Sequence, residues 1–188
     1  MKEQKIREII DHNLKKIVDI ELNKLPINIE EEMSDPNQDK NEEWRIWYPI
    51  KSKVTDKEIE DFENQIQHKL PDDYKMFLKY KHFYELYISE VTFTRHPVNS
   101  WRANQIKAIF KGYPNEYLID KGFIPFADWS DWGLLCFDTN QKSEGNNYPI
   151  VLWDHEIADE VTHQYTDFYE MMLELELAEQ TKSDEDDE

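Results

Sequence analysis

The chain has 188 residues, of which 41 are Asp or Glu and 22 are Lys or Arg, so its formal net charge is −19. A surface this negative repels phosphate backbones and anionic lipids, so we expect neither nucleic acid nor a membrane as a partner, and a basic protein is the natural complement. Cys136 is the single cysteine, which excludes an intramolecular disulfide and a cysteine-based zinc cluster.

The N-terminus has no apolar core like that of a signal peptide, and no stretch approaches the roughly 20 apolar residues that cross a bilayer. We therefore expect a soluble cytoplasmic protein. Apolar residues from Ile6 to Val18 recur at helical spacing, and Pro26 ends the pattern. This predicts an amphipathic helix within residues 1–25, followed by an acidic linker without periodicity over 26–43.

A folded domain is predicted over residues 44–180, because Trp44, Trp47 and Tyr48 appear together at its start. Thr55 and Glu58 have the spacing of a capping box, which predicts the start of a helix there. Pro71 ends that helix and opens a second one, since proline is tolerated in the first turn of a helix.

Residues 87–94 alternate and are rich in β-branched and aromatic side chains, which predicts a strand. A helix is predicted over 101–111, with Asn99 or Ser100 as its cap and Gly112 as a left-handed terminator. Three apolar runs then predict strands over 123–127, 132–137 and 148–153.

Apolar residues from Tyr165 to Leu175 predict a final helix, and residues 181–188 are predicted to be a disordered acidic tail. Helices followed by strands and a last helix, without strict alternation, favour an α+β fold with a largely antiparallel sheet.

Motifs for common catalytic routes are missing from the sequence. The four glycines are too widely spaced for a phosphate-binding loop, and there is no H-E-x-x-H, G-x-S-x-G or C-x-x-C motif. We expect no catalytic residue, cofactor or metal. Three adjacent ligand-type residues follow a predicted strand: Asp154, His155 and Glu156. Their side chains point in alternate directions on an extended chain, so a solvated turn is favoured over a metal site or a catalytic role.

Cys136 lies in an apolar strand, which is typical of a small buried hydrophobe. The other histidines are scattered and are interpreted as surface or capping residues; they are His12, His68, His82, His96 and His163.

The stretch Asp128, Trp129, Asp131 and Trp132 combines tryptophans with carboxylates between two predicted strands. Its tryptophans can be core residues that fasten the loop, or anchors of an interface that attracts a basic partner. Together with Asp154 and Glu156, these four residues form the candidate partner-binding surface. Trp44 and Trp47 face the same choice, and the core is favoured for both.

Three blocks of the sequence form a recognisable pattern. The first runs from Val54 to Leu78 and contains L-P-x-x-Y-x-x-F-L, the second is F-I-P-F-A-D-W-S-D-W-G-L-L-C-F-D over 123–138, and the third is Y-P-I-V-L-W-D-H-E over 148–156. In this order the blocks resemble the SUKH superfamily, which includes the fungal Smi/Knr cell-wall assembly regulators. The resemblance covers about residues 44–177. The chain departs from the family pattern after Leu78, where an Asn-Gly pair is common, and at the turn before Gly133.

The resemblance implies a non-enzymatic α+β binding domain of the SUKH type. Many bacterial members are immunity proteins that neutralise a polymorphic toxin, often a nuclease, whereas fungal members act as scaffolds in cell-wall regulation. The acidic charge suits the first role, because a nuclease presents a basic groove. We therefore expect a basic toxin domain as partner, with a scaffold or regulatory protein as the alternative.

Overall fold

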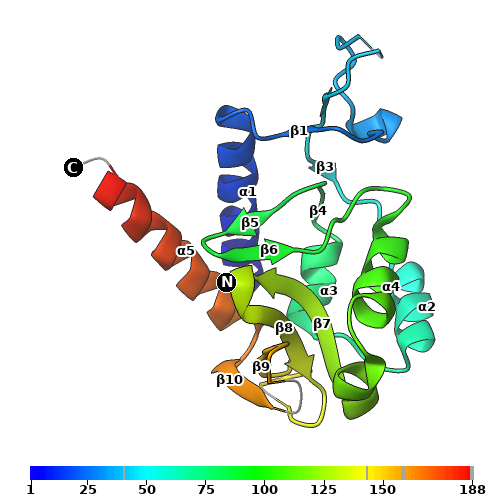
Figure 1. The fold of residues 1–188 in the computed structure, drawn as a ribbon, viewed down its shortest axis with the longest axis vertical. Coiled ribbons are helices and arrows are strands. Elements are labelled where there is room, and N and C mark those ends of the chain that lie inside the picture. Colours follow the sequence, from blue (N-terminus) through cyan, green and yellow to red (C-terminus); the bar gives the residue numbers. More distant parts are fainter. Residues whose placement is uncertain (40, 143, 158–159, 187–188) are drawn as a thin grey trace.

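The computed structural model describes residues 1–39, 41–142, 144–157 and 160–186. Its centre is an antiparallel sheet in the order β10-β9-β8-β7-β6-β5 (Figure 1). Its strands are β5 (Tyr87–Ile88), β6 (Val91–Phe93), β7 (Phe123–Trp129), β8 (Gly133–Asp138), β9 (Ile150–Trp153) and β10 (Val161–Tyr165). The predicted α+β class with a largely antiparallel sheet is confirmed.

The helices and two small sheets surround this sheet. The helices are α1 (Lys2–Asp19), α2 (Asp56–Ile66), α3 (Asp72–Leu78), α4 (Trp101–Lys111) and α5 (Phe168–Asp186). The small sheets pair β1 (Lys24–Leu25) with β2 (Arg45–Ile46), and β3 (Ile50–Lys51) with β4 (Lys81–His82). Short 3-10 helices occupy Glu31–Met33, Asn115–Tyr117, Ile119–Lys121 and Ser130–Trp132.

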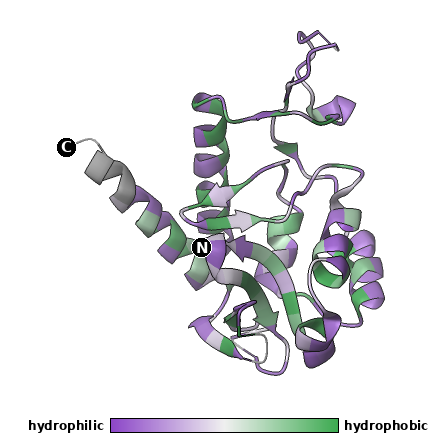
Figure 2. Cartoon of the chain, viewed as in Figure 1, coloured by the Kyte–Doolittle hydropathy of each residue, from purple (hydrophilic) through white to green (hydrophobic). Residues whose placement is uncertain are grey.

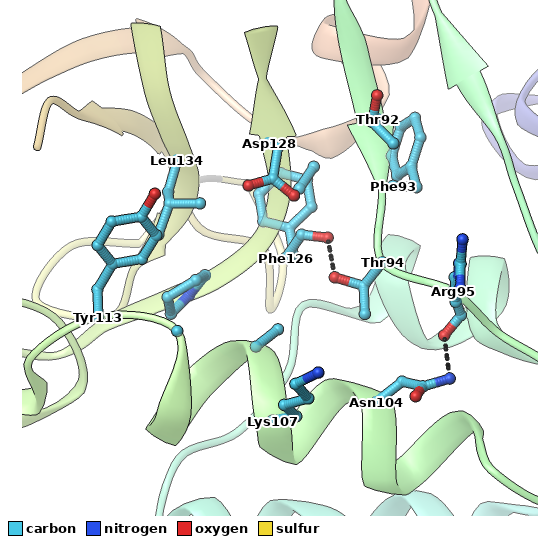
Figure 3. Close-up of a pocket in the computed structure, with 14 residues that line it drawn as sticks. Thr92, Phe93, Thr94, Arg95, Asn104, Lys107, Tyr113, Phe126, Asp128 and Leu134 are labelled. Atoms are coloured by element: carbon cyan, nitrogen blue, oxygen red, sulfur yellow. Dashed lines mark hydrogen bonds between the residues drawn. The ribbon is translucent and has the colours of Figure 1, made fainter. Parts of the chain in front are cut away.

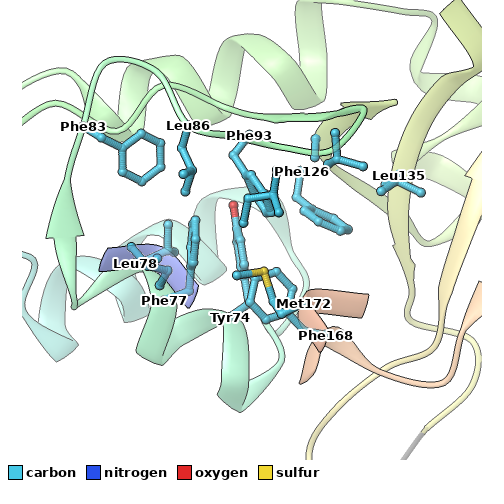
Figure 4. Packing of buried hydrophobic residues seen from close by; sticks show 14 of the residues in the cluster. Tyr74, Phe77, Leu78, Phe83, Leu86, Phe93, Phe126, Leu135, Phe168 and Met172 are labelled. Atoms are coloured by element: carbon cyan, nitrogen blue, oxygen red, sulfur yellow. The ribbon is translucent and has the colours of Figure 1, made fainter. Parts of the chain in front are cut away.

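The main core lies between the inner face of the sheet, α3 and α5. Tyr74 and Phe77 of α3 pack against Phe126 and Phe93 of the sheet and against Phe168 of α5, with ring centroids 5.2–5.6 Å apart in the pairs that they form (Figure 4). Edge-to-face and offset pairs of this kind are favourable beyond the area that they bury. The L-P-x-x-Y-x-x-F-L motif thus supplies the aromatic centre of the core.

The outer face of the sheet carries a smaller apolar cluster. Leu134 and Cys136 of β8 and Val151 and Trp153 of β9 pack there with Leu118, which precedes the 3-10 turn at 119–121. Every residue of β8 is therefore buried, and hydrophobic residues are concentrated along β7 and β8 (Figure 2). Cys136 is fully buried, as expected, and burial raises the pKa of its thiol well above the usual value.

The first helix belongs to the same core as the rest of the fold. Ile6, Ile9 and Ile10 of α1 are buried in the main cluster, and α1 packs along α5, where Asn13 donates a hydrogen bond of 2.8 Å to Glu176. A stripe of apolar residues predicts the buried face of a helix, but it does not predict which element covers that face.

The segment 26–43 also contacts the folded part. Met33 is buried, Ser34 forms a bridge with Trp47, and the backbone N–H of Glu30 donates to the Tyr84 hydroxyl at 2.7 Å. The boundaries at 1–25, 26–43, 44–180 and 181–188 stay a prediction. Glu30, Met33 and Ser34 of the predicted linker contact the folded part, whereas most of its other described residues are exposed. It lacks periodicity because it contributes single side chains and not a continuous face.

The junction between α2 and α3 is fixed by local chemistry. Thr55 and Glu58 form the predicted capping box, with the Glu58 N–H 3.2 Å from the Thr55 hydroxyl oxygen. At the other end of α2, the buried Glu63 accepts hydrogen bonds from the Leu70 N–H at 2.9 Å and the Lys69 ammonium at 2.7 Å. Burial disfavours its charge, but these donors and Lys75 outweigh that effect and lower its pKa.

Several local predictions are wrong in detail. Gly112 follows α4 with φ −75°, so it is right-handed and not the left-handed terminator expected. The strand predicted over 87–94 is a hairpin, because Ser89 turns the chain with φ 54°. Strand β10 was not predicted, since its exposed residues do not form an apolar run.

At the C-terminus, α5 extends to Asp186 and so enters the segment predicted as an acidic tail. Residues 187–188 of that prediction lie outside the described residues. Within the part of the chain that the structure describes, no helix has the length and apolar character needed to cross a bilayer.

Candidate functional site

The turn between β7 and β8 carries four of the predicted site residues. Asp128 and Trp129 are the last residues of β7, and Asp131 and Trp132 lie in the 3-10 turn that leads to Gly133. Ser130 has a positive φ of 47° in this turn, which places the chain in the left-handed region for one residue. The stretch is therefore a tight, structured connection.

The loop after β9 carries the other two predicted residues. The Asp154 carboxylate accepts a hydrogen bond of 2.8 Å from the Glu156 N–H, and the Asp154 carbonyl accepts one of 3.2 Å from the Ile157 N–H. Asp154 is half-buried, whereas His155 and Glu156 are exposed. These contacts make the segment the solvated turn that the sequence favoured. No group of three His, Cys, Asp or Glu residues among those described could hold a metal ion.

The sheet brings these two connections together. Leu134 pairs with Trp153 in the β8–β9 ladder, and Val161 of β10 pairs with the same Trp153. Val91 pairs with Trp129, so the hairpin that contains Glu90 reaches this end too. We call this end of the sheet the acidic end; its carboxylates are Glu90, Asp128, Asp131, Asp154, Glu156 and Glu160.

Basic side chains are scarce in the segments that build the acidic end. The sequence contains no Lys or Arg between Lys121 and Lys142, and none between Lys142 and Lys182. The two connections thus contribute negative charge that no Lys or Arg of their own offsets. A field of this kind attracts basic partners at a distance and repels acidic ones.

The two tryptophans of the turn have different environments. Trp129 is half-buried against the main core, and its ring is stacked on Tyr165 with centroids 6.2 Å apart. Trp132 is 62% exposed, and Ile157 in the neighbouring loop is 53% exposed. The two alternatives for this stretch therefore both occur, with Trp129 as the fastening residue and Trp132 as a candidate anchor. Trp47 is fully buried, as expected, whereas the prediction that Trp44 is a core residue is wrong, since it is 54% exposed.

A groove adjoins the acidic end on the outer face of the sheet. Its floor follows a row of register partners, in which Thr92 lies opposite Asp128, and Asp128 lies opposite Leu134. Its wall is the second half of α4 with Lys107 and the following Tyr113, and its volume is about 360 Å³ (Figure 3). Asp128 therefore belongs to both the acidic end and the groove.

The electrostatic state of Asp128 follows from the groove walls. One side of its carboxylate is open to solvent, but the surrounding protein removes water from the rest and raises the pKa of Asp128. The Asp128 carboxylate has no direct hydrogen-bond or ion-pair partner among the described residues.

Tyr113 and Lys107 form the opposite wall. The Tyr113 ring meets the edge of the Trp153 ring with centroids 5.0 Å apart, and this contact holds the phenol over the groove. Lys107 is exposed, and within the described residues no carboxylate lies close enough to pair with it. Sequence reasoning missed Thr92, Lys107 and Tyr113, because strand register and helix packing bring them together and no local motif contains them.

Two histidines that the sequence placed at the surface lie in the interior instead. His82 and His96 are fully buried, with their rings stacked 4.9 Å apart. His96 Nε2 donates to the Leu78 carbonyl at 2.8 Å, and His82 Nε2 accepts from the Lys53 N–H at 2.9 Å. The prediction of surface or capping roles is wrong for this pair, because β4 and the bridge at His96 turn both side chains inward.

Comparison with known families adds the last observation. The model of the SMI1 / KNR4 family (SUKH-1) matches residues 53–174. The chain belongs to this family. The match begins just before α2 and ends within α5, so it includes the acidic end and the groove but not α1. SUKH-1 proteins are generally non-enzymatic. None of the curated proteins compared with the chain matches it.

Proposed function

We propose that this SUKH-1 protein is a non-enzymatic immunity protein that neutralises a basic toxin domain by direct binding through its acidic end. The observation that carries the proposal is the combination of Asp131, Asp154 and Glu156 with the exposed Trp132 on two connections that the sheet brings together. Charge would attract the partner, and the tryptophan would anchor it.

The physical argument for this role concerns speed as well as affinity. An inhibitor of a toxin must bind before damage occurs, and complementary charge raises association rates well above those of neutral surfaces. A nuclease is a suitable toxin class, because its phosphate-binding groove is basic and would face the carboxylates of the acidic end. Blocking of that groove by the acidic end requires no chemistry from the inhibitor.

The alternative is a scaffold or regulatory protein of the cell-wall assembly type, which would bind several partners weakly through free segments. Its support is the family itself. The packing of Met33 and Glu30 against the folded part speaks for the immunity role, because it reduces the free chain that such a hub would use.

The first test is affinity purification of the tagged full chain from cells that contain its partner. One stoichiometric basic protein that is released as salt rises would support the proposal, with a dissociation constant of about 1 nM or below, equivalent to about −12 kcal/mol. A broad set of weak partners would favour the scaffold role and contradict the immunity role.

A matched pair of variants then locates the surface. Asp131→Lys with Glu156→Lys changes the acidic end, whereas Glu31→Lys with Glu60→Lys makes the same change in net charge at exposed positions elsewhere. We expect the first variant to slow association and flatten its salt dependence, and the second to change both much less. Equal effects of the two variants would show that net charge acts without the acidic end.

A further inference from the structure

The groove beside the acidic end offers a specific place for one side chain of a partner. Its floor combines the Asp128 carboxylate with the Thr92 hydroxyl and the apolar surface of Leu134, and the Tyr113 ring closes one side (Figure 3). A carboxylate, a hydroxyl and an aromatic face around an apolar floor fit a long side chain that ends in a flat cation.

We propose that this groove receives an arginine side chain of the partner, with the guanidinium on Asp128 and the aliphatic part against Tyr113 and Leu134. The inference rests on the proposed function for the source of the arginine, but the groove's preference for this chemistry can be tested alone. The proposal specifies the residue type of the partner and its binding position in the groove, which we call the arginine seat. The acidic end as a whole specifies neither.

The carboxylate is the first reason for this assignment. Asp128 has no partner among the described residues, while the groove walls already exclude part of its water. A cation that pairs with it therefore gains a charge-assisted contact, and folding has already met part of the cost of removing water from the carboxylate. The planar guanidinium can present two N–H groups to one carboxylate, which a lysine ammonium cannot do in the same geometry.

The aromatic wall is the second reason. Tyr113 packs against Trp153 in an edge-to-face contact, so one side of its ring is supported by the fold before any partner arrives. Guanidinium groups stack on aromatic faces, and the methylene stem of arginine covers apolar surface such as that of Leu134. The volume of about 360 Å³ leaves room for one such side chain together with water.

The positive charge of Lys107 on α4 allows a second test of the proposal. Lys107 lines the same groove and forms no ion pair with a described residue, so its ammonium disfavours a second cation there. Arg95 also lines the groove, but it is paired with Glu85 at 3.2 Å. If an arginine binds on Asp128, removal of the Lys107 charge must strengthen binding, whereas removal of the Asp128 charge must weaken it.

The experiment is a titration of the full chain with Nα-acetyl-arginine methylamide, followed by backbone amide chemical shifts. We expect shifts at Thr92, Lys107 and Tyr113 that saturate in the millimolar range, and little change with the uncharged norleucine analogue. Asp128→Asn should weaken binding about tenfold, since it removes the ion pair and keeps the shape. Lys107→Gln should strengthen it roughly twofold, because it removes a repulsive charge.

The outcomes separate this proposal from the function. Asp131→Asn is the control, because it removes a carboxylate of the acidic end that does not line the groove. Shifts that persist unchanged in Asp128→Asn, or that appear equally with norleucine, would overturn the arginine seat. Those results would leave the salt-dependent binding of a basic protein intact. Saturable binding of the probe by a chain that captures no stoichiometric basic protein in the affinity purification would support the seat and contradict the immunity role.

Discussion

Gly133 lies so close to Trp153 that a Cβ at position 133 would overlap the Trp153 carbonyl oxygen. The backbone of Gly133 also has φ 134°, which side chains rarely adopt. This close approach allows the start of β8 to meet the end of β9, and it therefore joins the two connections of the acidic end.

Gly133→Ala should consequently reduce the free energy of unfolding by about 3 kcal/mol, from the overlap and the strained backbone together. Gly145→Ala is the matched control, since Gly145 also has a positive φ of 71° but no atom within 4 Å of the added Cβ. It should cost only about 1 kcal/mol. Urea unfolding measures both, and equal losses would show that the approach to Trp153 is not tight.

The buried Glu63 should stabilise the junction between α2 and α3 through its ion pairs. Glu63→Gln keeps the size of the side chain but removes the charge that faces Lys69 and Lys75, so we expect a loss of about 2 kcal/mol. Glu60→Gln on the exposed side of the same helix should change stability by less than about 0.5 kcal/mol. Thermal unfolding compares the two, and similar melting temperatures would contradict the role of Glu63.

The buried histidine pair predicts a dependence on pH. Burial lowers the pKa of His96 to about 3, with a contribution from His82, whose own pKa is also lowered by burial. The unfolded chain takes up protons near the ordinary pKa of 6.5 while the folded chain does not, so stability falls as pH falls below about 6.5. Each histidine contributes up to about 1.4 kcal/mol per pH unit.

The variant His96→Gln tests this origin. Glutamine can still donate to the Leu78 carbonyl, but it takes up no proton in this range, so the slope of stability between about pH 6.5 and pH 5 should become smaller. His163→Gln, at an exposed position, should leave the slope unchanged. Denaturant unfolding at several pH values gives the slopes, and an unaltered slope in His96→Gln would assign the acid sensitivity to other groups.

The first helix should be necessary for the fold. Ile9→Ala removes a buried side chain of the main core and should cost about 3 kcal/mol, whereas Ile20→Ala, which lies just beyond the helix and is exposed, should cost little. Deletion of residues 1–25 should leave a chain that binds hydrophobic dyes and lacks a cooperative transition. If the deletion variant folds with unchanged stability, the first helix is a separate element and not part of the core.

The two tryptophans of the turn should separate stability from binding. Trp129→Ala removes the stacking on Tyr165 and should cost about 2 kcal/mol, while Trp132→Ala should stay within about 0.5 kcal/mol of the parent. With the partner in hand, Trp132→Ala should shorten the lifetime of the complex by tenfold or more, on the order of an interface anchor. An unchanged lifetime would remove Trp132 from the binding surface.

The sequence predicts best where the physical cause is local. The capping box at Thr55 and Glu58 involves residues three positions apart, and the structure confirms it. The groove depends on the pairing of Thr92 with Asp128, which are distant in the chain, so no local pattern contains it. The prediction of surface positions for His82 and His96 was wrong for the same reason, since the two histidines come from different segments that pack on each other.

Charge patterning was informative in one respect and incomplete in another. The stretch from Asp128 to Trp132 could be recognised as a candidate site from composition alone. Which tryptophan is exposed depends on the 3-10 turn and on Tyr165, which arrives from β10, a strand without an apolar run. The sequence therefore proposed this stretch as a candidate surface, but it could not predict which tryptophan packs on Tyr165 and which one is exposed.

Because Cys136 is buried, its reaction with a thiol reagent can be used to measure local opening of the unmodified chain. Its thiol lies in β8 with a raised pKa, so a thiol reagent can react only during openings that expose this strand. The labelling rate then measures how often the centre of the sheet opens, without any engineered probe. A partner that binds the acidic end and stabilises the sheet would lower the labelling rate of Cys136. The same measurement would therefore detect formation of the complex.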